Sequence, residues 1–319
     1  MTMHSPAGPG SIDFMLGWQC NARCIQCWEA VNRRNGWQPE RWKRELDVAV
    51  LCGVLSRHAG TLAATTLISF GEPMLHSGFG AILRALLAHR TPDGVQLGIS
   101  MVTNGSLLHE HPEIVDSPGC LTVSFDAPEA ALYEGIRQGL RFDAVLSNMA
   151  LVARRRCPGR LLYVNMTVFK RNASTVYAMA QLLSSIGFTG LAVIRGAALG
   201  LSGLQEEELD PLCPEVHAQI ARARRDFPGL TLNDYFHTID GPWATPVGEH
   251  CKLPWMKMDI TPDGAAHPCC RSYRVDLGTW PEEQWAGPKM TRLRGQLASF
   301  RVDPVEFDQC ATCPARGNA

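Results

Sequence analysis

Three cysteines, Cys20, Cys24 and Cys27, lie within eight residues near the start of the sequence. Thiolates are soft ligands that bind zinc, copper(I) or iron–sulfur clusters. A structural zinc site normally has a fourth cysteine or histidine close by, and none lies next to these three. A 4Fe–4S cluster held by three cysteines leaves one iron free to bind a substrate or cofactor. The spacing therefore favours a cluster of this kind, with structural zinc as the alternative.

A second group of cysteines lies near the end of the chain. Residues 256–260 and 265–269 predict a β-hairpin, because the segment 261–264 supplies proline and glycine where a turn needs them. The hairpin brings Cys251 and Cys269 near each other, and Cys310 and Cys313 follow a helical pattern at residues 289–300. Four thiolates would hold either zinc or a fully ligated 4Fe–4S cluster.

Alternating strand and helix patterns must position the first group. Short, mostly apolar runs predict buried parallel strands at residues 12–18, 65–70, 96–102, 121–125, 161–167 and 191–195. Helical patterns lie between and after them, at residues 44–57, 78–88, 129–139, 144–155, 173–187 and 205–226. This alternation predicts an α/β fold with right-handed crossovers, as an open sheet or an incomplete barrel. We see no internal repeat, and the proline- and glycine-rich segment 238–248 reads as a bridge between two modules.

Polar residues follow several of the predicted strands. In either architecture, functional side chains belong at the C-terminal ends of parallel strands. The three cysteines follow the first strand, and the same edge should carry Gly71, Glu72, Pro73, Asn104, Ser124 and Asn165.

Composition narrows the class of protein. The 319 residues are 45% hydrophobic and 19% charged, with a formal net charge of −1, which argues against a nucleic-acid or anionic-lipid partner. No apolar stretch approaches the ~20 residues of a membrane-spanning helix, and the N-terminus is not a secretory signal. We therefore expect a cytoplasmic protein, whose twelve cysteines are ligands, catalytic groups or buried apolar residues rather than disulfides.

These motifs resemble those of the radical S-adenosylmethionine (radical SAM) enzymes with a C-terminal SPASM extension of the short, Twitch type. The cysteine loop and the segment from Gly71 to Pro73 carry the likeness, although Phe70 replaces the first glycine of the family's Gly-Gly-Glu-Pro segment. The resemblance implies a partial (β/α)6 TIM-like barrel and a small β-hairpin/helix iron–sulfur domain. It divides the chain into a flexible N-terminus (1–11), a radical SAM core (12–200), a bridging segment (201–250) and an auxiliary-cluster domain (251–319).

The same resemblance assigns cofactors and ligands. It implies S-adenosylmethionine and two 4Fe–4S clusters, one held by the N-terminal three cysteines and one by Cys251, Cys269, Cys310 and Cys313. Asn104 also suits an ordinary turn, and Arg137 is equally compatible with a surface helix. The residues that the resemblance places near S-adenosylmethionine are Gly71, Glu72, Pro73, Asn104, Ser124, Arg137 and Asn165.

The implied activity is reductive cleavage of S-adenosylmethionine to a 5′-deoxyadenosyl radical that abstracts a hydrogen atom from an unactivated C–H bond. We expect a small polar metabolite, sugar- or aminocyclitol-like, as substrate, and net dehydrogenation with the second cluster as electron acceptor. An electron donor such as flavodoxin or ferredoxin is the implied partner.

Other outcomes stay open. The first is epimerisation, for which Cys270 is the candidate hydrogen donor because its neighbour Cys269 is a predicted ligand. The second is modification of a ribosomal or short peptide, disfavoured because only eleven residues precede the first predicted strand, too few for a leader-recognition domain. A third alternative is not enzymatic: the protein would be a zinc-binding scaffold without catalytic activity.

Overall fold

A computed structural model of the chain describes residues 7–36, 40–198, 203–236, 251–270, 272 and 274–313. The predicted bridge at residues 238–248, and residues 1–6 of the predicted flexible N-terminus, lie outside the described residues. No helix in these ranges is long and apolar enough to cross a membrane.

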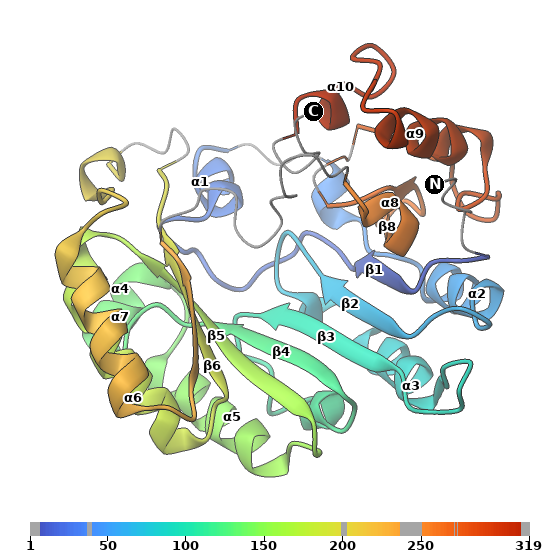
Figure 1. The fold of residues 1–319 in the computed structure, drawn as a ribbon. Coiled ribbons are helices and arrows are strands. Elements are labelled where there is room, and N and C mark those ends of the chain that lie inside the picture. The colour runs from blue at the N-terminus through green and yellow to red at the C-terminus, as the bar shows by residue number, and fades with distance from the viewer. Residues whose placement is uncertain are drawn as a thin grey trace.

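One curved sheet of nine strands organises the fold, in the order β7-β6-β5-β4-β3-β2-β1-β8-β9 (Figure 1). Every neighbouring pair is parallel except β8 and β9, which form an antiparallel hairpin. The strands are β1 (Ser11–Met15), β2 (Ala64–Ile68), β3 (Gly98–Thr103), β4 (Gly119–Ser124), β5 (Arg160–Val168), β6 (Gly190–Arg195), β7 (Thr231–Tyr235), β8 (Lys257–Ile260) and β9 (Ala266–His267).

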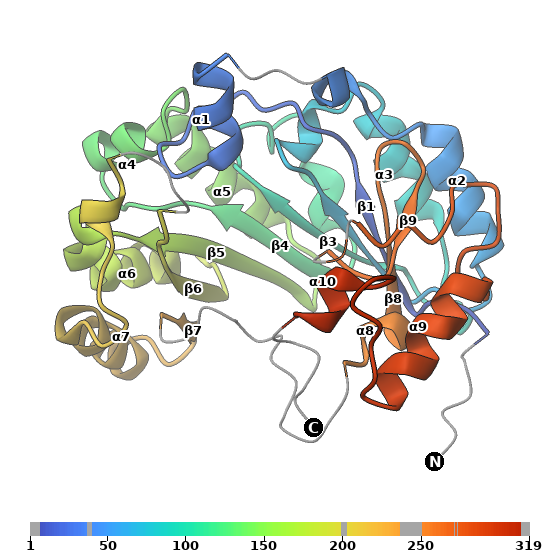
Figure 2. The ribbon, with the colours of Figure 1, turned by 90° about the horizontal axis from the view of Figure 1, so that it is seen from above.

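Helices cover the outer face of this sheet (Figure 2). The α-helices are α1 (Trp28–Arg34), α2 (Val48–Arg57), α3 (Phe79–Ala88), α4 (Ala130–Ile136), α5 (Phe142–Arg155), α6 (Val176–Ile186), α7 (Pro214–Asp226), α8 (Leu253–Met256), α9 (Pro288–Ala298) and α10 (Asp308–Ala311). Short 3-10 helices are η1 (Glu40–Lys43), η2 (Pro73–Leu75), η3 (Pro112–Val115), η4 (Lys170–Thr175) and η5 (Gln205–Glu207).

The period of two along each strand separates a core face from an inner face. On β1, Ile12 and Phe14 join the hydrophobic core that the outer helices complete, and Asp13 and Met15 point the other way. On β8, Met258 and Ile260 likewise belong to the core. The concave, inner face is therefore free to carry polar side chains for a site.

The predicted α/β fold with a parallel, incompletely closed sheet is confirmed. The six predicted strands correspond to β1 to β6, and the predicted hairpin corresponds to β8 and β9. Helix α1, the short helices α8 and α10, and strand β7 were not predicted; β7 adds a further parallel strand beside β6. The predicted helix at 205–226 is a short 3-10 turn, η5, followed after a break by α7.

The C-terminal segment packs directly on the first strand. Strand β8 pairs in parallel with β1, and the register sets Asp13 beside Asp259. On α9, Met290, Leu293 and Leu297 are buried and join the common core. The guanidinium of Arg57, at the end of α2, donates to the carbonyls of residues 281 and 282 at 2.6 and 2.7 Å. Hairpin and barrel strands thus share one sheet.

Candidate functional site

The cysteine loop leaves the C-terminal end of β1 and is shaped by α4. The backbone N–H of Arg23 donates to the carbonyl of Gln138 at 2.7 Å, and that of Ile25 donates to Ile136 at 3.0 Å. These two bonds fasten the loop to the last residue of α4 and to the turn directly after it, a segment more than one hundred positions further along the chain. Cys27 then forms the N-cap of α1.

Helix α1 secures the loop from its other side. The guanidinium of Arg33 donates to the carbonyls of Cys20 and Ala22 at 3.1 and 3.2 Å. Backbone carbonyls held in this way cannot relax freely, so the loop is constrained at both ends. Helix α1 was not predicted from the sequence, although its seven residues orient Cys27.

The three thiols lie close enough to influence one another. Burial raises the pKa of Cys20 and of Cys24, and the neighbouring thiols add to both shifts. Among the described residues, no three His, Cys, Asp or Glu side chains meet around a point where a single metal ion would sit. The donor set is three soft thiols, which fits an iron–sulfur cluster.

Gly71 lies where β2 meets the cysteine loop. A Cβ atom at this position would lie 1.9 Å from the carbonyl oxygen of Gln19, so the contact requires glycine. The N–H of the next residue, Glu72, donates to the same carbonyl at 2.7 Å. The Gly-Glu-Pro segment therefore presses directly on the backbone that precedes Cys20.

The carboxylate of Glu72 is buried and fully occupied by this chain. Its Oε1 accepts from the hydroxyl of Thr103 at 2.7 Å and from the N–H of Met74 at 3.3 Å. Its Oε2 accepts from the N–H of Asn104 at 2.7 Å. Burial raises the pKa of Glu72, and these three bonds oppose that rise. Pro73 follows as the first residue of η2.

The other residues predicted at this edge also gather there. The amide of Asn104 donates to the side-chain oxygen of Asn21 at 2.8 Å and lies 4.0 Å from the sulfur of Cys20. Ser124 and Asn165 are register partners on β4 and β5 and are half-buried on the inner face. The parallel sheet therefore brings these side chains to one edge, as the strand pattern predicted.

Arg137 lies inside the site and not on a surface helix. Its Nε donates to Asp126 at 2.6 Å, and its Nη1 lies 3.7 Å from the sulfur of Cys24. Burial works to lower the pKa of Arg137, but the charges of Asp126 and Cys24 raise it above its ordinary value. The surface-helix alternative is therefore wrong, because this side chain is only 12% exposed.

The four C-terminal cysteines form the second thiol group. Burial raises the pKa of Cys251 to about 11 and that of Cys310 to about 12, and in both cases Cys269 and Cys313 add to the shift. The four thiols are thus close enough to interact. A carboxylate, Asp308, is also near Cys310 and adds a smaller effect. Four thiols are a donor set that suits a fully ligated cluster.

A charged group that the sequence analysis missed occupies the inner face where β1 meets β8. Lys257 pairs with Asp13 and lies 3.3 Å from Asp259. Neither carboxylate oxygen of Asp259 accepts a hydrogen bond from a described residue, although the side chain is 1% exposed. Burial raises the pKa of Asp259 to about 7, opposed by Lys257 and assisted by Asp13. Cys270 is solvent-exposed and lies near all three charges.

One signal could have revealed this group. Asp13 stands inside an apolar strand, and a charge in such a place is normally paired or functional. Its partners lie about 245 positions further along the chain, and no local sequence pattern predicts that pairing.

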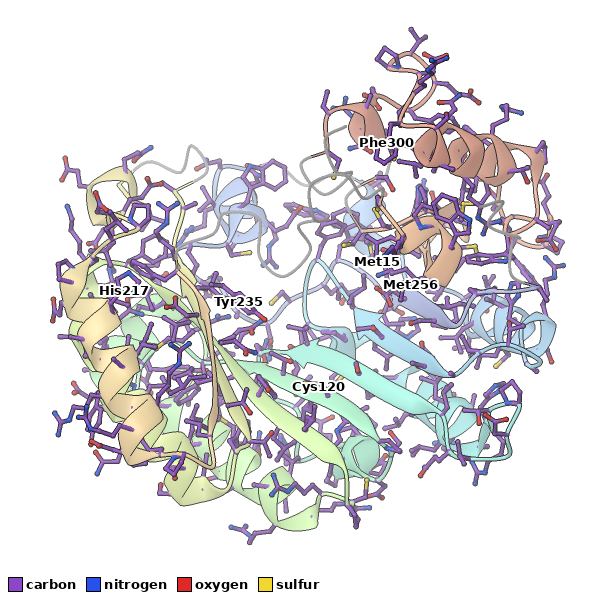
Figure 3. The ribbon with its side chains drawn as sticks, viewed as in Figure 1. Met15, Cys120, His217, Tyr235, Met256 and Phe300 are labelled. Carbon is purple, nitrogen blue, oxygen red and sulfur yellow. The ribbon has the colours of Figure 1, made fainter. Side chains whose placement is uncertain are left out.

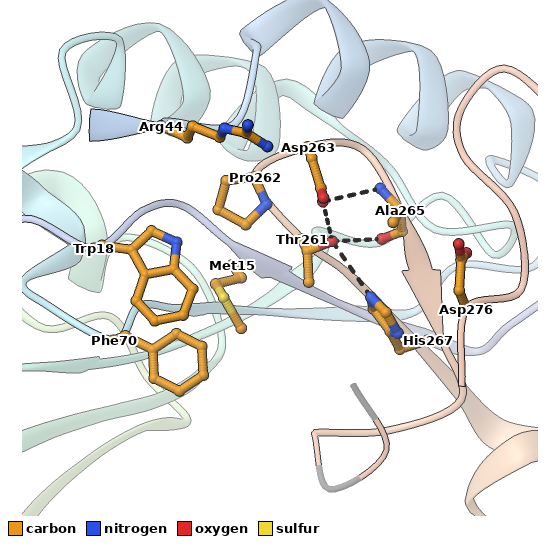
Figure 4. Close-up of a pocket in the computed structure, with 10 residues that line it drawn as sticks. All are labelled: Met15, Trp18, Arg44, Phe70, Thr261, Pro262, Asp263, Ala265, His267 and Asp276. Carbon is orange, nitrogen blue, oxygen red and sulfur yellow. Dashed lines mark hydrogen bonds between the residues drawn. The ribbon is translucent and has the colours of Figure 1, made fainter. Parts of the chain in front are cut away.

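A pocket of about 380 Å³ opens beside this charged group (Figure 4). Met15 of β1 and His267 of β9 line it on the inner face, and Thr261 lies at the hairpin turn. Trp18 and Phe70, whose ring centroids are 4.1 Å apart, stack at its edge. Figure 3 shows the side chains along the sheet, from Tyr235 on β7 to Met15 on β1. The volume is that of a small-molecule site.

Comparisons with known proteins identify the family of the chain. The model of the radical SAM superfamily matches residues 18–183, and that of the SPASM iron–sulfur cluster-binding domain matches residues 251–314. A comparison with curated protein sequences finds no match.

Solved structures share the fold at low sequence identity. Streptococcus suis SuiB bound to S-adenosylmethionine superimposes with a TM-score of 0.63 at 13% identity, covering 93% of this chain and 67% of SuiB. SuiB bound to the precursor peptide SuiA gives 0.64 at 12%, covering 93% and 66%. Native anSMEcpe bound to AdoMet gives 0.66 at 15%, covering 88% and 82%. The chain thus spans about two thirds of SuiB.

The family model matches more than half of the chain's length. The chain therefore belongs to the radical SAM superfamily and carries a C-terminal SPASM iron–sulfur domain.

Proposed function

We propose that this radical SAM enzyme dehydrogenates a small polar metabolite of the sugar or aminocyclitol class. Cys20, Cys24 and Cys27 would hold one 4Fe–4S cluster, and Cys251, Cys269, Cys310 and Cys313 a second. When bound, the first cluster with S-adenosylmethionine would supply a 5′-deoxyadenosyl radical for hydrogen abstraction, and the second cluster an acceptor for the electron that the substrate loses.

The protein's own residues would position the cofactor and the substrate and exclude water from the site. Gly71 and Glu72 hold the cofactor edge against the cysteine loop, and Ser124 and Asn165 present polar groups from neighbouring strands on the inner face. We assign S-adenosylmethionine to this edge. The Trp18–Phe70 stack at the pocket rim would limit the access of water.

The main support for the proposal is the parallel pairing of β1 with β8, which we call the β1–β8 seam. One strand leads directly into the N-terminal thiols, and its neighbour leads through the hairpin to Cys269. The inner face of this seam carries Asp13, Lys257 and Asp259. The pocket itself is lined by their neighbours, Met15 two residues after Asp13 on β1 and His267 opposite Asp259 on β9. Charged, largely buried groups at this place support a small, polar and hydrogen-bonding substrate.

Cys270 favours epimerisation as a second candidate. Its thiol lies near the charges of the seam as well as near Cys269, whereas Cys310 lies near the other three predicted ligand thiols. A hydrogen donor beside the substrate is what an epimerase requires to quench a substrate radical. In a dehydrogenase the same thiol would have no part in the reaction.

The test begins with anaerobic reconstitution, iron counting and an assay for reductive formation of 5′-deoxyadenosine. A brown protein that makes 5′-deoxyadenosine supports the class, and its loss when Cys20, Cys24 and Cys27 are changed to Ala assigns the cluster. Retained cleavage in that triple variant, or a colourless zinc protein, would refute the proposal.

The reaction type is read from product masses in D₂O with a panel of sugars and aminocyclitols. Dehydrogenation gives a product lighter than its substrate by one hydrogen molecule, and Cys270→Ala leaves its rate unchanged. Epimerisation gives a product heavier by one mass unit, because one deuterium replaces the hydrogen that was abstracted, and Cys270→Ala abolishes it. If the enzyme modifies a peptide and neither a sugar nor an aminocyclitol, it is a peptide-modifying enzyme and the proposal is wrong.

A further inference from the structure

One cationic side chain approaches a ligand sulfur of the first thiol group. Nη1 of Arg137 lies 3.7 Å from the sulfur of Cys24, within the range of an N–H···S hydrogen bond. Arg33, on helix α1, donates to backbone carbonyls of the loop, and although its charge also acts on Cys20 it donates no hydrogen bond to that sulfur. Arg137 therefore has a distinct relation to the metal-binding atoms.

Asp126 fixes the direction of this guanidinium. It is fully buried and accepts from Nε of Arg137 at 2.6 Å, from the amide of Gln26 at 2.7 Å and from the N–H of Thr167 at 2.8 Å. Both oxygens are engaged, and the donors come from three different parts of the site. Since Asp126 cannot turn without breaking these bonds, Nε is anchored and Nη1 is aimed at Cys24.

Main-chain hydrogen bonds also hold the segment around Arg137 against the cysteine loop. The neighbours of Arg137, Ile136 and Gln138, accept from the two loop N–H groups that flank Cys24. Any shift of α4 would thus move the loop with it. The distance from Nη1 to the sulfur is set by paired main-chain bonds and does not depend on a flexible side chain alone.

We propose that Arg137 raises the reduction potential of the cluster held by Cys20, Cys24 and Cys27 by donating an N–H to the Cys24 thiolate. The inference rests on the proposed function only in assuming that this cluster binds. Reduction adds one electron, so a nearby fixed cation and a hydrogen bond to sulfur stabilise the reduced form more than the oxidised form. Water is largely excluded from this guanidinium, which strengthens the effect.

This role differs from contact with S-adenosylmethionine, near which Arg137 was predicted to lie and whose carboxylate a guanidinium could pair with. The two are separable, because the potential can be measured before S-adenosylmethionine is added. An effect on carboxylate binding alone would leave that potential unchanged.

The test compares wild type, Arg137→Gln and Arg137→Lys after anaerobic reconstitution of the full chain. Arg141→Gln is the matched control, since Arg141 is exposed and pairs only with Glu134 among the described residues. Each protein is titrated with titanium(III) citrate, which gives one electron per cluster and becomes titanium(IV). The reduced fraction is followed by electron paramagnetic resonance. The signal that changes when S-adenosylmethionine is added afterwards identifies the cluster of interest, and the other signal is an internal reference.

At the wild-type midpoint potential we expect the reduced-to-oxidised ratio to fall at least tenfold in Arg137→Gln, a shift of about 59 mV for one electron. Arg137→Lys keeps the charge and should lie between the two, and Arg141→Gln should match wild type. If Arg137→Gln does not load a cluster, Arg137→Lys carries the comparison. An unshifted midpoint with weakened S-adenosylmethionine binding would overturn the inference and leave the proposed function standing. A wild-type protein without any cluster would remove the proposed function itself.

Discussion

Replacing Gly71 by alanine tests how the Gly-Glu-Pro segment and the cysteine loop depend on each other. The added methyl group would lie 1.9 Å from the carbonyl oxygen of Gln19 and 2.6 Å from that of Trp18. Both atoms belong to the backbone, so no side-chain rotation relieves the contact. Because real Cβ contacts of this kind are not shorter than 3.0 Å, the two segments must separate by about 1 Å.

The energetic cost follows from that separation. Forcing a methyl group into a packed place costs about 1–3 kcal/mol. The bond from the Glu72 N–H to the Gln19 carbonyl would lengthen or break, which adds about 1 kcal/mol. Alanine restricts the unfolded chain and returns about 0.4–1 kcal/mol. The free energy of unfolding should therefore fall by about 1–4 kcal/mol.

Urea unfolding of the metal-free protein measures this change, with Gly60→Ala as the matched control. Gly60 is exposed, and nothing lies within 4 Å of the place where its Cβ would be. The same proteins are then reconstituted and assayed for 5′-deoxyadenosine, where a misplacement near 1 Å should lower the rate about 100-fold. If Gly71→Ala unfolds within 0.5 kcal/mol of Gly60→Ala, roughly the range of neutral surface changes, the steric reasoning is wrong.

Three further predictions use the same protein. Cys251→Ala should lower the iron content by about one cluster and destabilise the C-terminal domain; unchanged iron on reconstitution would move the ligand role elsewhere. Glu72→Ala should cost about 2–4 kcal/mol in urea unfolding because it strands the buried N–H of Asn104, with Glu72→Gln milder; equal losses would contradict this. The raised pKa of Asp259 makes the folded state bind the extra proton between pH 4 and about 7, so its contribution to stability falls as pH rises through that window. Asp259→Asn should therefore gain thermal stability over wild type at pH 8 relative to pH 5, and the exposed Asp93→Asn should not.

Local patterns predicted most of the barrel because short, mostly apolar runs leave a strong signal, even though the structure fully buries only one face of most strands. The strands β1 to β6 are short apolar runs, and their order along the chain already predicts which ends meet. Strand β7 was missed because Thr231–Tyr235 mixes polar and apolar residues at the end of the chain of strands. Helix α1 was missed because its seven residues are mostly polar and its position depends on contacts with a distant loop.

Site residues that directly follow a strand could be predicted from the sequence. Contacts that depend on how distant segments pack together could not. Residues after strands were expected at one edge, and Glu72, Asn104, Ser124 and Asn165 do lie there. The partners of Glu72 within the protein could not be foreseen, because they depend on how two neighbouring loops meet. The pairing of β8 with β1, and with it Lys257 beside Asp13, joins segments that share no local signal.

Two buried charge groups border the site, and their hydrogen bonding separates a structural role from a functional one. Asp126 is neutralised by Arg137 and accepts bonds on both oxygens, so that group is complete without any ligand. At the β1–β8 seam two carboxylates share a single lysine, and Asp259 accepts no hydrogen bond from the described residues. An incomplete buried group lowers stability unless something else completes it. Because His267, opposite Asp259 on β9, lines the pocket, the two oxygens of Asp259 support placing the substrate at the seam, with hydrogen-bonding groups turned toward them.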